Sequence, residues 1–167
     1  MKRTHNCGQL RASDVGSEVS LVGWIDSIRD HGGILFIDLR DREGLTQIKA
    51  NPHSDDAAFN QSVNGLKDES VIAVAGQVVA RDGENINPSL PTGEVEVDVS
   101  QVVVHNIAET PPFPIDDVKG DRVHEDLRLK YRYLDLRRDK MRKAIKLRHE
   151  TTRSIRSYLD DEGFYDV

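Results

Sequence analysis

The chain is poor in the residues that form disulfides, metal cages and membrane spans. Cys7 is the only cysteine among 167 residues, which excludes an internal disulfide and a cysteine zinc cage and favours a reducing compartment. The six histidines are scattered without metal-ligand spacing, and no apolar run is long enough to cross a bilayer. The first residues show no apolar region of a secretory signal. We therefore expect a cytoplasmic protein with no metal site and no membrane partner.

The charge of the chain is unevenly distributed. The net charge of −6 at first disfavours a nucleic-acid partner. Residues 1–117 hold 9 Lys and Arg against 19 Asp and Glu, whereas residues 118–156 hold 14 Lys and Arg against 6 Asp and Glu. The basic segment is either the solvated face of a helix or a stripe that faces a polyanion, and composition does not separate these two interpretations.

A hairpin is the most informative pattern in the sequence. Residues 33–50, GILFIDLRDREGLTQIKA, alternate in polarity on both sides of a polar turn at residues 40–44, which predicts two strands. One face of the hairpin is mostly apolar, with Leu35, Ile37, Leu39, Thr46, Ile48 and Ala50. The opposite face carries Phe36, Asp38, Arg40, Leu45, Gln47 and Lys49.

The aromatic ring of Phe36 is the unusual residue on this second face. A ring that faces water loses free energy unless something flat covers it, and a nucleobase is flat. A stacked base contributes roughly 1–3 kcal/mol, and a neighbouring amide such as that of Gln47 can read the edge of the base. Single exposed aromatics are also common on sheets without any function, so the hairpin alone leaves both interpretations open.

The segments around the hairpin predict a small barrel. A strand at 19–29, with a bend or bulge at Gly23, precedes it. A helix capped by Ser54 or Asp55 follows and runs to about Leu66, and strands are expected at 71–80 and 94–104. The inner side of the helix is expected to be Ala57, Ala58, Phe59, Val63 and Leu66. In the last strand Val95, Val97 and Val99 should face the core, and Glu94, Glu96 and Asp98 should face out.

This order of elements is that of a mainly β, five-stranded Greek-key barrel of the OB type with one inter-strand helix. Such barrels use their second and third strands to hold oligonucleotides. We expect this domain at 1–106 and a hinge at 107–137, which opens with Pro111, Pro112 and Pro114. The charge-dense run 124–138 offers a narrow apolar edge of Leu127, Tyr131, Leu134 and Leu136.

A long helix is expected at 139–162, within a third part at 138–167. Gly163 should end this helix, and residues 164–167 resemble the start of a strand. Its apolar stripe consists of Met141, Ile145, Thr152, Ile155 and Leu159. This stripe must be buried against something. The rest of a further domain, the barrel itself and a second copy of the chain are the three possible partners.

Several stretches of the chain resemble bacterial-type aspartyl-tRNA synthetases. They are HNCGQL at 5–10, residues 21–48, RDGENINP at 81–88, TGEVEV at 92–97 and RLKYRYLDLRR at 128–138. The RYLDLRR run is shared by the aspartate, asparagine and lysine enzymes of this class II subgroup, and GGILFIDLRDREG narrows the choice to aspartate. The resemblance covers essentially the whole chain and corresponds to the N-terminal portion of such an enzyme.

The resemblance implies an anticodon-binding OB domain, a hinge and the first helix of a class II catalytic domain. By position, Phe36 stacks on the middle anticodon base and Gln47 binds the edge of that base. Arg29 contacts the anticodon loop, and Arg81, Asn85 and Glu96 contact the outer bases or their backbone. A carboxylate such as Glu96 suits an exocyclic amine such as that of cytosine.

The resemblance implies tRNA(Asp) as a partner. It also implies tRNA(Asn), because the loop at residues 31–33 is similar to that of enzymes that charge both of these tRNAs. The intact parent would be a homodimer that ligates aspartate to tRNA with ATP and Mg²⁺. Two alternatives remain: a general single-strand binder built on an OB barrel, and a structural fragment that dimerises through the 139–162 helix and binds nothing.

We predict that this chain by itself activates no amino acid. In the family, the two arginine motifs that bind ATP and the acidic pocket that binds magnesium come after the first catalytic helix. We therefore expect no catalytic residue and no cofactor in residues 1–167. No glycine loop of the P-loop or Rossmann kind is present in the sequence either. An ATP–pyrophosphate exchange assay with aspartate should give background, and clear turnover would contradict this expectation.

Overall fold

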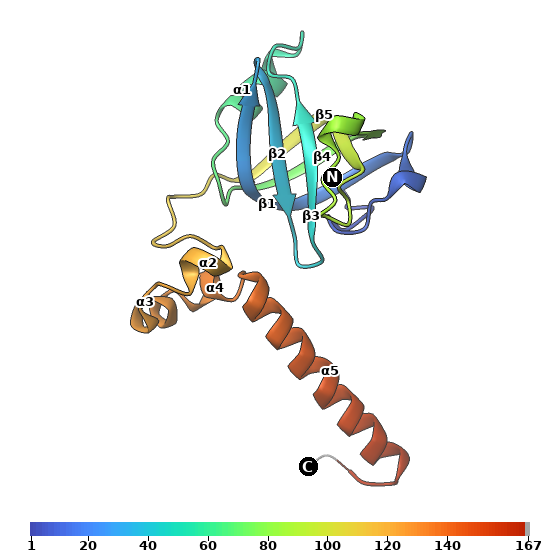
Figure 1. Ribbon diagram of the computed structural model, residues 1–167, viewed down its shortest axis with the longest axis vertical. Helices are drawn as coiled ribbons and strands as arrows, with labels where there is room; N and C mark the ends of the chain where they lie inside the picture. The colour runs from blue at the N-terminus through green and yellow to red at the C-terminus, as the bar shows by residue number, and fades with distance from the viewer. Residues whose placement is uncertain (166–167) are drawn as a thin grey trace. The chain divides into compact units, whose positions relative to one another are not determined.

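The computed structural model describes residues 1–165 (Figure 1). The chain forms two compact units, Met1–Pro111 and Pro112–Val167, and each is described by itself below. The division into 1–106, 107–137 and 138–167 stays a prediction. The strand expected at 164–167 is not formed by Phe164 and Tyr165, and its last two residues lie outside the described part of the chain.

The first unit is a closed barrel of five strands. The strands are β1 (Glu18–His31), β2 (Ile34–Arg40), β3 (Leu45–Ala50), β4 (Val71–Ala80) and β5 (Val95–Asn106). Their order around the barrel is β1-β2-β3-β5-β4. Only the β3–β5 pair is parallel, while the others are antiparallel. Helix α1 (Ala57–Asn64) connects β3 to β4, so the predicted mainly β, OB-type barrel is confirmed.

The period-two alternation of the strands places the core as expected. Ile37, Leu39, Ile48, Val95 and Val97 are each at most 1% exposed. The segment before β1 adds Cys7 and Leu10 to this core. Burial and the neighbouring Asp41 carboxylate raise the pKa of the Cys7 thiol far above its ordinary value, so that the thiol stays protonated and unreactive at neutral pH.

The start and the inner side of α1 differ from the expectation. The helix is capped by Asp56, whose carboxylate accepts hydrogen bonds from the amides of Ala58 and Phe59, rather than by Ser54 or Asp55. Ala57 and Ala58 are exposed. The buried positions are Phe59 and Val63, because residues four apart share one face of a helix.

The bulge in β1 lies at Asp26, three residues beyond Gly23, the predicted position. Gly23 itself allows close approach of the backbones, since a Cβ there would lie 2.5 Å from the carbonyl oxygen of Arg40. The register against β2 shifts between Ile25 and Ser27. One extra residue in a strand reverses which face the following side chains occupy. After the bulge, Ser27 and Arg29 therefore share the outer face of the barrel.

The second unit begins with three short helices, and an ion cluster around the buried Arg138 joins the first and the third of them. They are α2 (Asp117–Gly120), α3 (Glu125–Lys130) and α4 (Arg132–Asp135). The guanidinium of Arg138 is fully buried and bonds to Asp121 and, at 3.0 Å, to Asp135. Burial lowers the pKa of Arg138, but these two carboxylates raise it by more, so that the net shift is upward. The same contact, together with Lys140, lowers the pKa of Asp121.

Helix α5 (Asp139–Asp161) confirms the predicted long helix. It ends in a Schellman motif, in which Gly163 has φ +83°. The backbone amide of Gly163 donates to the carbonyl of Asp160, and that of Phe164 donates to the carbonyl of Leu159. Ile145, Ile155 and Leu159 of the predicted stripe are 46%, 55% and 41% exposed, so the unit itself does not bury this face. No helix in the described range 1–165 is both long and apolar enough to span a membrane.

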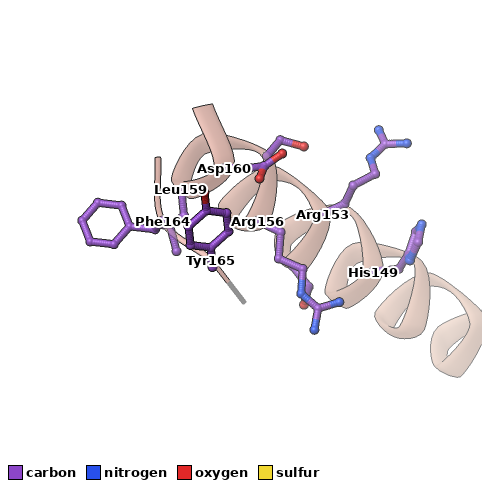
Figure 2. A pocket seen from close by; sticks show the side chains of 9 residues that line it. His149, Arg153, Arg156, Leu159, Asp160, Phe164 and Tyr165 are labelled. Atoms are coloured by element: carbon purple, nitrogen blue, oxygen red, sulfur yellow. The ribbon is translucent and has the colours of Figure 1, made fainter. Parts of the chain in front are cut away.

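A pocket lies beside the C-terminal end of α5 (Figure 2). On one side it is lined by His149, Arg153 and Arg156 of the helix, and at the returning chain by Phe164 and Tyr165. Because its walls come from one helix and the chain that turns back from it, the pocket lacks the enclosing walls typical of a small-molecule site.

The Gly76→Ala substitution should destabilise the barrel. A Cβ at this position would lie 2.1 Å from the Asp98 carbonyl oxygen and 2.8 Å from the Val99 Cα, so strands β4 and β5 would have to separate, at a cost of about 1–3 kcal/mol. Urea unfolding followed by the fluorescence of Trp24, the only tryptophan, measures the change in the free energy of unfolding.

Gly83→Ala is the matched control for this prediction. No atom lies within 4 Å of the corresponding Cβ position, and an uncrowded surface substitution changes the free energy of unfolding by less than about 0.5 kcal/mol. Equal stability of the two variants would contradict the close strand approach at Gly76.

Candidate functional site

Two rows of side chains cross the outer face of β1, β2, β3 and β5. The strand register places Arg29 opposite Phe36, and Phe36 opposite Lys49. The same register pairs Ser27 with Asp38, and Asp38 with Gln47, in the adjacent row. Side chains that are paired across strands lie about 4.5–5.5 Å apart at their Cβ atoms, so the two rows form one continuous surface.

A chain of hydrogen bonds runs along the second row. The Ser27 hydroxyl donates to Oδ2 of Asp38 at 2.8 Å. Nη2 of Arg29 donates to Oδ1 of Asp38 at 3.0 Å and to Oε1 of Gln47 at 3.1 Å. Nε2 of Gln47 then donates to Oε2 of Glu96, on β5, at 2.6 Å. Strands β1, β2, β3 and β5 thus contribute to one polar network, which runs from Ser27 to Glu96.

Phe36 lies beside this network and outside the core. Its side chain is half-buried on the outer face, and its ring meets the His31 ring edge-on, with centroids 6.2 Å apart and planes at 81°. Arg29 and Lys49 flank it in register. A hydrophobic ring between two cationic side chains suits a flat, electron-rich partner.

Arg81 follows β4 directly and interacts electrostatically with Glu96, Asp38 and Arg29 of this network. It is 8% exposed, and its Nε donates to the carbonyl of Val95 at 2.9 Å. Burial lowers the pKa of Arg81, an effect that the negative charges of Glu96 and Asp38 oppose. Nη2 of Arg81 is buried and has no hydrogen-bond partner among the described residues. A water molecule or an acceptor on a ligand would satisfy this donor.

The structure therefore brings together five of the six side chains singled out in the sequence, namely Arg29, Phe36, Gln47, Arg81 and Glu96. The sixth, Asn85, is exposed in the short 3-10 helix η2 (Gly83–Asn85), and its backbone amide donates to Asp82. No hydrogen bond between described residues links the Asn85 side chain to the network.

Ser27, Asp38 and Lys49 belong to this surface but were not singled out as site residues. Asp38 and Lys49 could have been found by alternation, because they follow Phe36 and Gln47 at intervals of two residues. Ser27 could not be assigned in this way, since the bulge reverses its face.

The chemistry of this surface is that of recognition. It offers an aromatic ring, an amide with one donor and one acceptor, and charged groups in fixed positions, which together suit a flat heterocycle with polar edges. Within residues 1–165, no cluster of three or more His, Cys, Asp or Glu side chains could hold a metal ion.

Comparison with known proteins identifies the class to which this fold and surface belong. Residues 19–104 match the OB-fold nucleic acid binding domain, and the chain belongs to that family. Residues 124–167 match the class II tRNA synthetases for D, K and N, so the expected resemblance to aspartyl-tRNA synthetases is confirmed.

Individual relatives support the same assignment. The chain is 57% identical over its full length to the aspartate–tRNA(Asp/Asn) ligase of Opitutus terrae. It is 48% identical over 99% of its length to the aspartate–tRNA ligase of Staphylococcus aureus. In each case it spans 28% of the relative's length. A solved aspartyl-tRNA synthetase of Entamoeba histolytica shares the fold with a TM-score of 0.84 at 21% identity, over 99% of this chain and 38% of that one.

Proposed function

We propose that the outer face of β1, β2, β3 and β5 binds the anticodon of tRNA(Asp). The observation that carries this proposal is the half-buried Phe36 ring beside the Arg29–Gln47–Glu96 network, on the barrel of a chain that belongs to an OB-fold nucleic acid binding family. OB barrels bind single strands by stacking bases on such aromatics.

Each side chain has a separate role in this proposal. Phe36 stacks on the middle base of the anticodon, and the Gln47 amide bonds to the edge of that base. Glu96 accepts a hydrogen bond from an exocyclic amine of an outer base, as cytosine offers. Arg29, Arg81 and Asn85 contact the loop around these bases, where guanidinium and amide groups donate to base and phosphate oxygens.

The relatives support a wider proposal. We propose that the chain serves an enzyme that ligates aspartate to tRNA as a homodimer, and that tRNA(Asn) is a second partner, since the Opitutus terrae relative is named for both tRNAs. Such an enzyme uses ATP and Mg²⁺. In this proposal the barrel surface contributes recognition of the anticodon. A cytoplasmic location agrees with the single thiol of Cys7.

A non-binding fragment that dimerises is the competing function, and the exposed apolar stripe of α5 favours it. A dimeric mass without retention of any stem-loop RNA at low salt would support that alternative. Equal binding of unrelated single strands would instead indicate a general single-strand binder.

Phe36→Ala should weaken binding of a tRNA(Asp) anticodon stem-loop by about 1–3 kcal/mol, because one base loses its stacking partner. Fluorescence anisotropy of a labelled stem-loop measures the affinity. Phe164→Ala, the same substitution at a 63% exposed ring in the second unit, should leave affinity unchanged.

Gln47→Ala should reduce discrimination at the middle base more than overall affinity, since a polar edge contact contributes mainly to specificity. Unchanged binding in both the Phe36 and the Gln47 variant would refute the assignment of the site.

The binding should depend weakly on salt. Residues 1–117 are strongly acidic, and Arg40 on the same face is paired with Asp26 and Glu69. The two rows and Arg81 then contribute three cations, Arg29, Lys49 and Arg81, so the slope of log K against log salt should not be steeper than about −2. Lys49→Ala should make the slope shallower by roughly 0.7. A slope of about −5 or steeper would contradict this and would indicate that the basic segment 118–156 contacts phosphates.

A further inference from the structure

The side-chain amide of Gln47 is held from both sides by groups of opposite hydrogen-bonding character. Its oxygen accepts from Nη2 of Arg29 at 3.1 Å, and its nitrogen donates to the Glu96 carboxylate at 2.6 Å. Arg29 can only donate and an ionised Glu96 can only accept. A rotation of the amide by 180° would therefore place donor against donor and acceptor against acceptor.

If the base beside Gln47 is a pyrimidine, the orientation of the amide would decide which pyrimidine edge it can pair with. On the edge of uracil, a donor at N3 lies next to an acceptor at O4, whereas cytosine presents an acceptor at N3 and a donor at N4. For a base held in one position, an amide whose oxygen faces N3 and whose nitrogen faces the group at C4 pairs with uracil. The same amide rotated by 180° pairs with cytosine. An amide locked in one orientation thus selects between the two bases, and a freely rotating amide accepts both.

Asp38 is the group that holds Arg29 in place. Its two carboxylate oxygens accept from the Ser27 hydroxyl and from Nη2 of Arg29. The Asp38 side chain is 15% exposed, while that of Arg29 is 50% exposed. An exposed arginine adopts many rotamers unless a fixed partner restricts it. The carboxylate, which is anchored to β1 through Ser27, provides that restriction.

We propose that Asp38 is a positioning residue: through Arg29 it supports one of the two contacts that fix the orientation of the Gln47 amide, the other being Glu96, and thereby strengthens the preference of the site between a uracil and a cytosine edge. The proposal rests on the proposed function, because it assigns to Asp38 a role in reading the base that Gln47 contacts. Asp38 need not touch the RNA.

The test compares Asp38→Ala with Asp98→Ala in the full chain. Asp98 is an exposed acid on β5 that is aligned with Lys49 of β3, so the control removes the same charge without affecting Arg29. Two anticodon stem-loops that differ only in uracil or cytosine at the middle position are titrated against each variant. We expect Asp38→Ala to reduce the affinity ratio for the two loops about tenfold, equivalent to about 1.4 kcal/mol, and Asp98→Ala to leave the ratio unchanged.

Two further variants separate positioning from a general structural effect. In a Gln47→Ala background, Asp38→Ala should cause no further change in the ratio, because its effect passes through the amide. Asp38→Asn keeps an oxygen that can accept from Arg29 and should retain part of the discrimination. Should Asp38→Ala fail to fold, Ser27→Ala removes only the anchoring hydroxyl and should lower the ratio in the same direction, by a smaller factor.

The outcomes distinguish the two proposals. An unchanged ratio in Asp38→Ala, with binding retained, would overturn the positioning role and leave the anticodon assignment intact. A reduction that persists in the Gln47→Ala background would also overturn it, since the effect would then not pass through the amide. If the unmodified chain binds neither stem-loop, both the proposed function and this inference fail.

Discussion

The candidate site depends on a single bulge in the first strand. Before the bulge, Leu21 and Ile25 of β1 point into the core, and strict alternation would carry Ser27 and Arg29 to the same inner side. The shift between Ile25 and Ser27 reverses this order and aligns Arg29 with Phe36 and Ser27 with Asp38. Without the extra residue, the guanidinium would face the valine core, and the Gln47 amide would lose its donor.

The electrostatics of this surface favour specificity over general affinity for RNA. Arg29 pairs with Asp38, and Arg81 interacts with the charges of Glu96 and Asp38, so part of their positive charge is offset at this surface. A balanced site attracts a polyanion weakly, but it presents each donor and acceptor in a fixed direction. An OB barrel that binds any single strand needs the opposite arrangement, a positive groove with several stacking rings.

The sequence predicts the barrel well because alternation is a local signal that does not depend on how the strands meet. Val71–Ala80 was located to the residue, and the inward valines of β5 are buried as expected. The bulge position, by contrast, is decided by packing between strands, and Gly23 marked only its neighbourhood. The burial of Arg81 is likewise a tertiary effect, since its partner at Val95 lies across a loop. The family resemblance predicts all six site residues, whereas alternation alone indicates only Phe36 and Gln47.

Helix α5, unlike the barrel, is determined by local interactions and not by tertiary packing. Its limits are set by local interactions: Asp139 pairs with Arg142 and Lys143 in the first turn, and the Schellman motif at Gly163 closes the end. These interactions stabilise a helix by tenths of a kcal/mol to about 1 kcal/mol each and leave its apolar face uncovered. The barrel instead derives its stability from a core that strands far apart in sequence bury together. The fixed position of the Gln47 amide, on which the proposed base contact rests, therefore depends on the packing of that core.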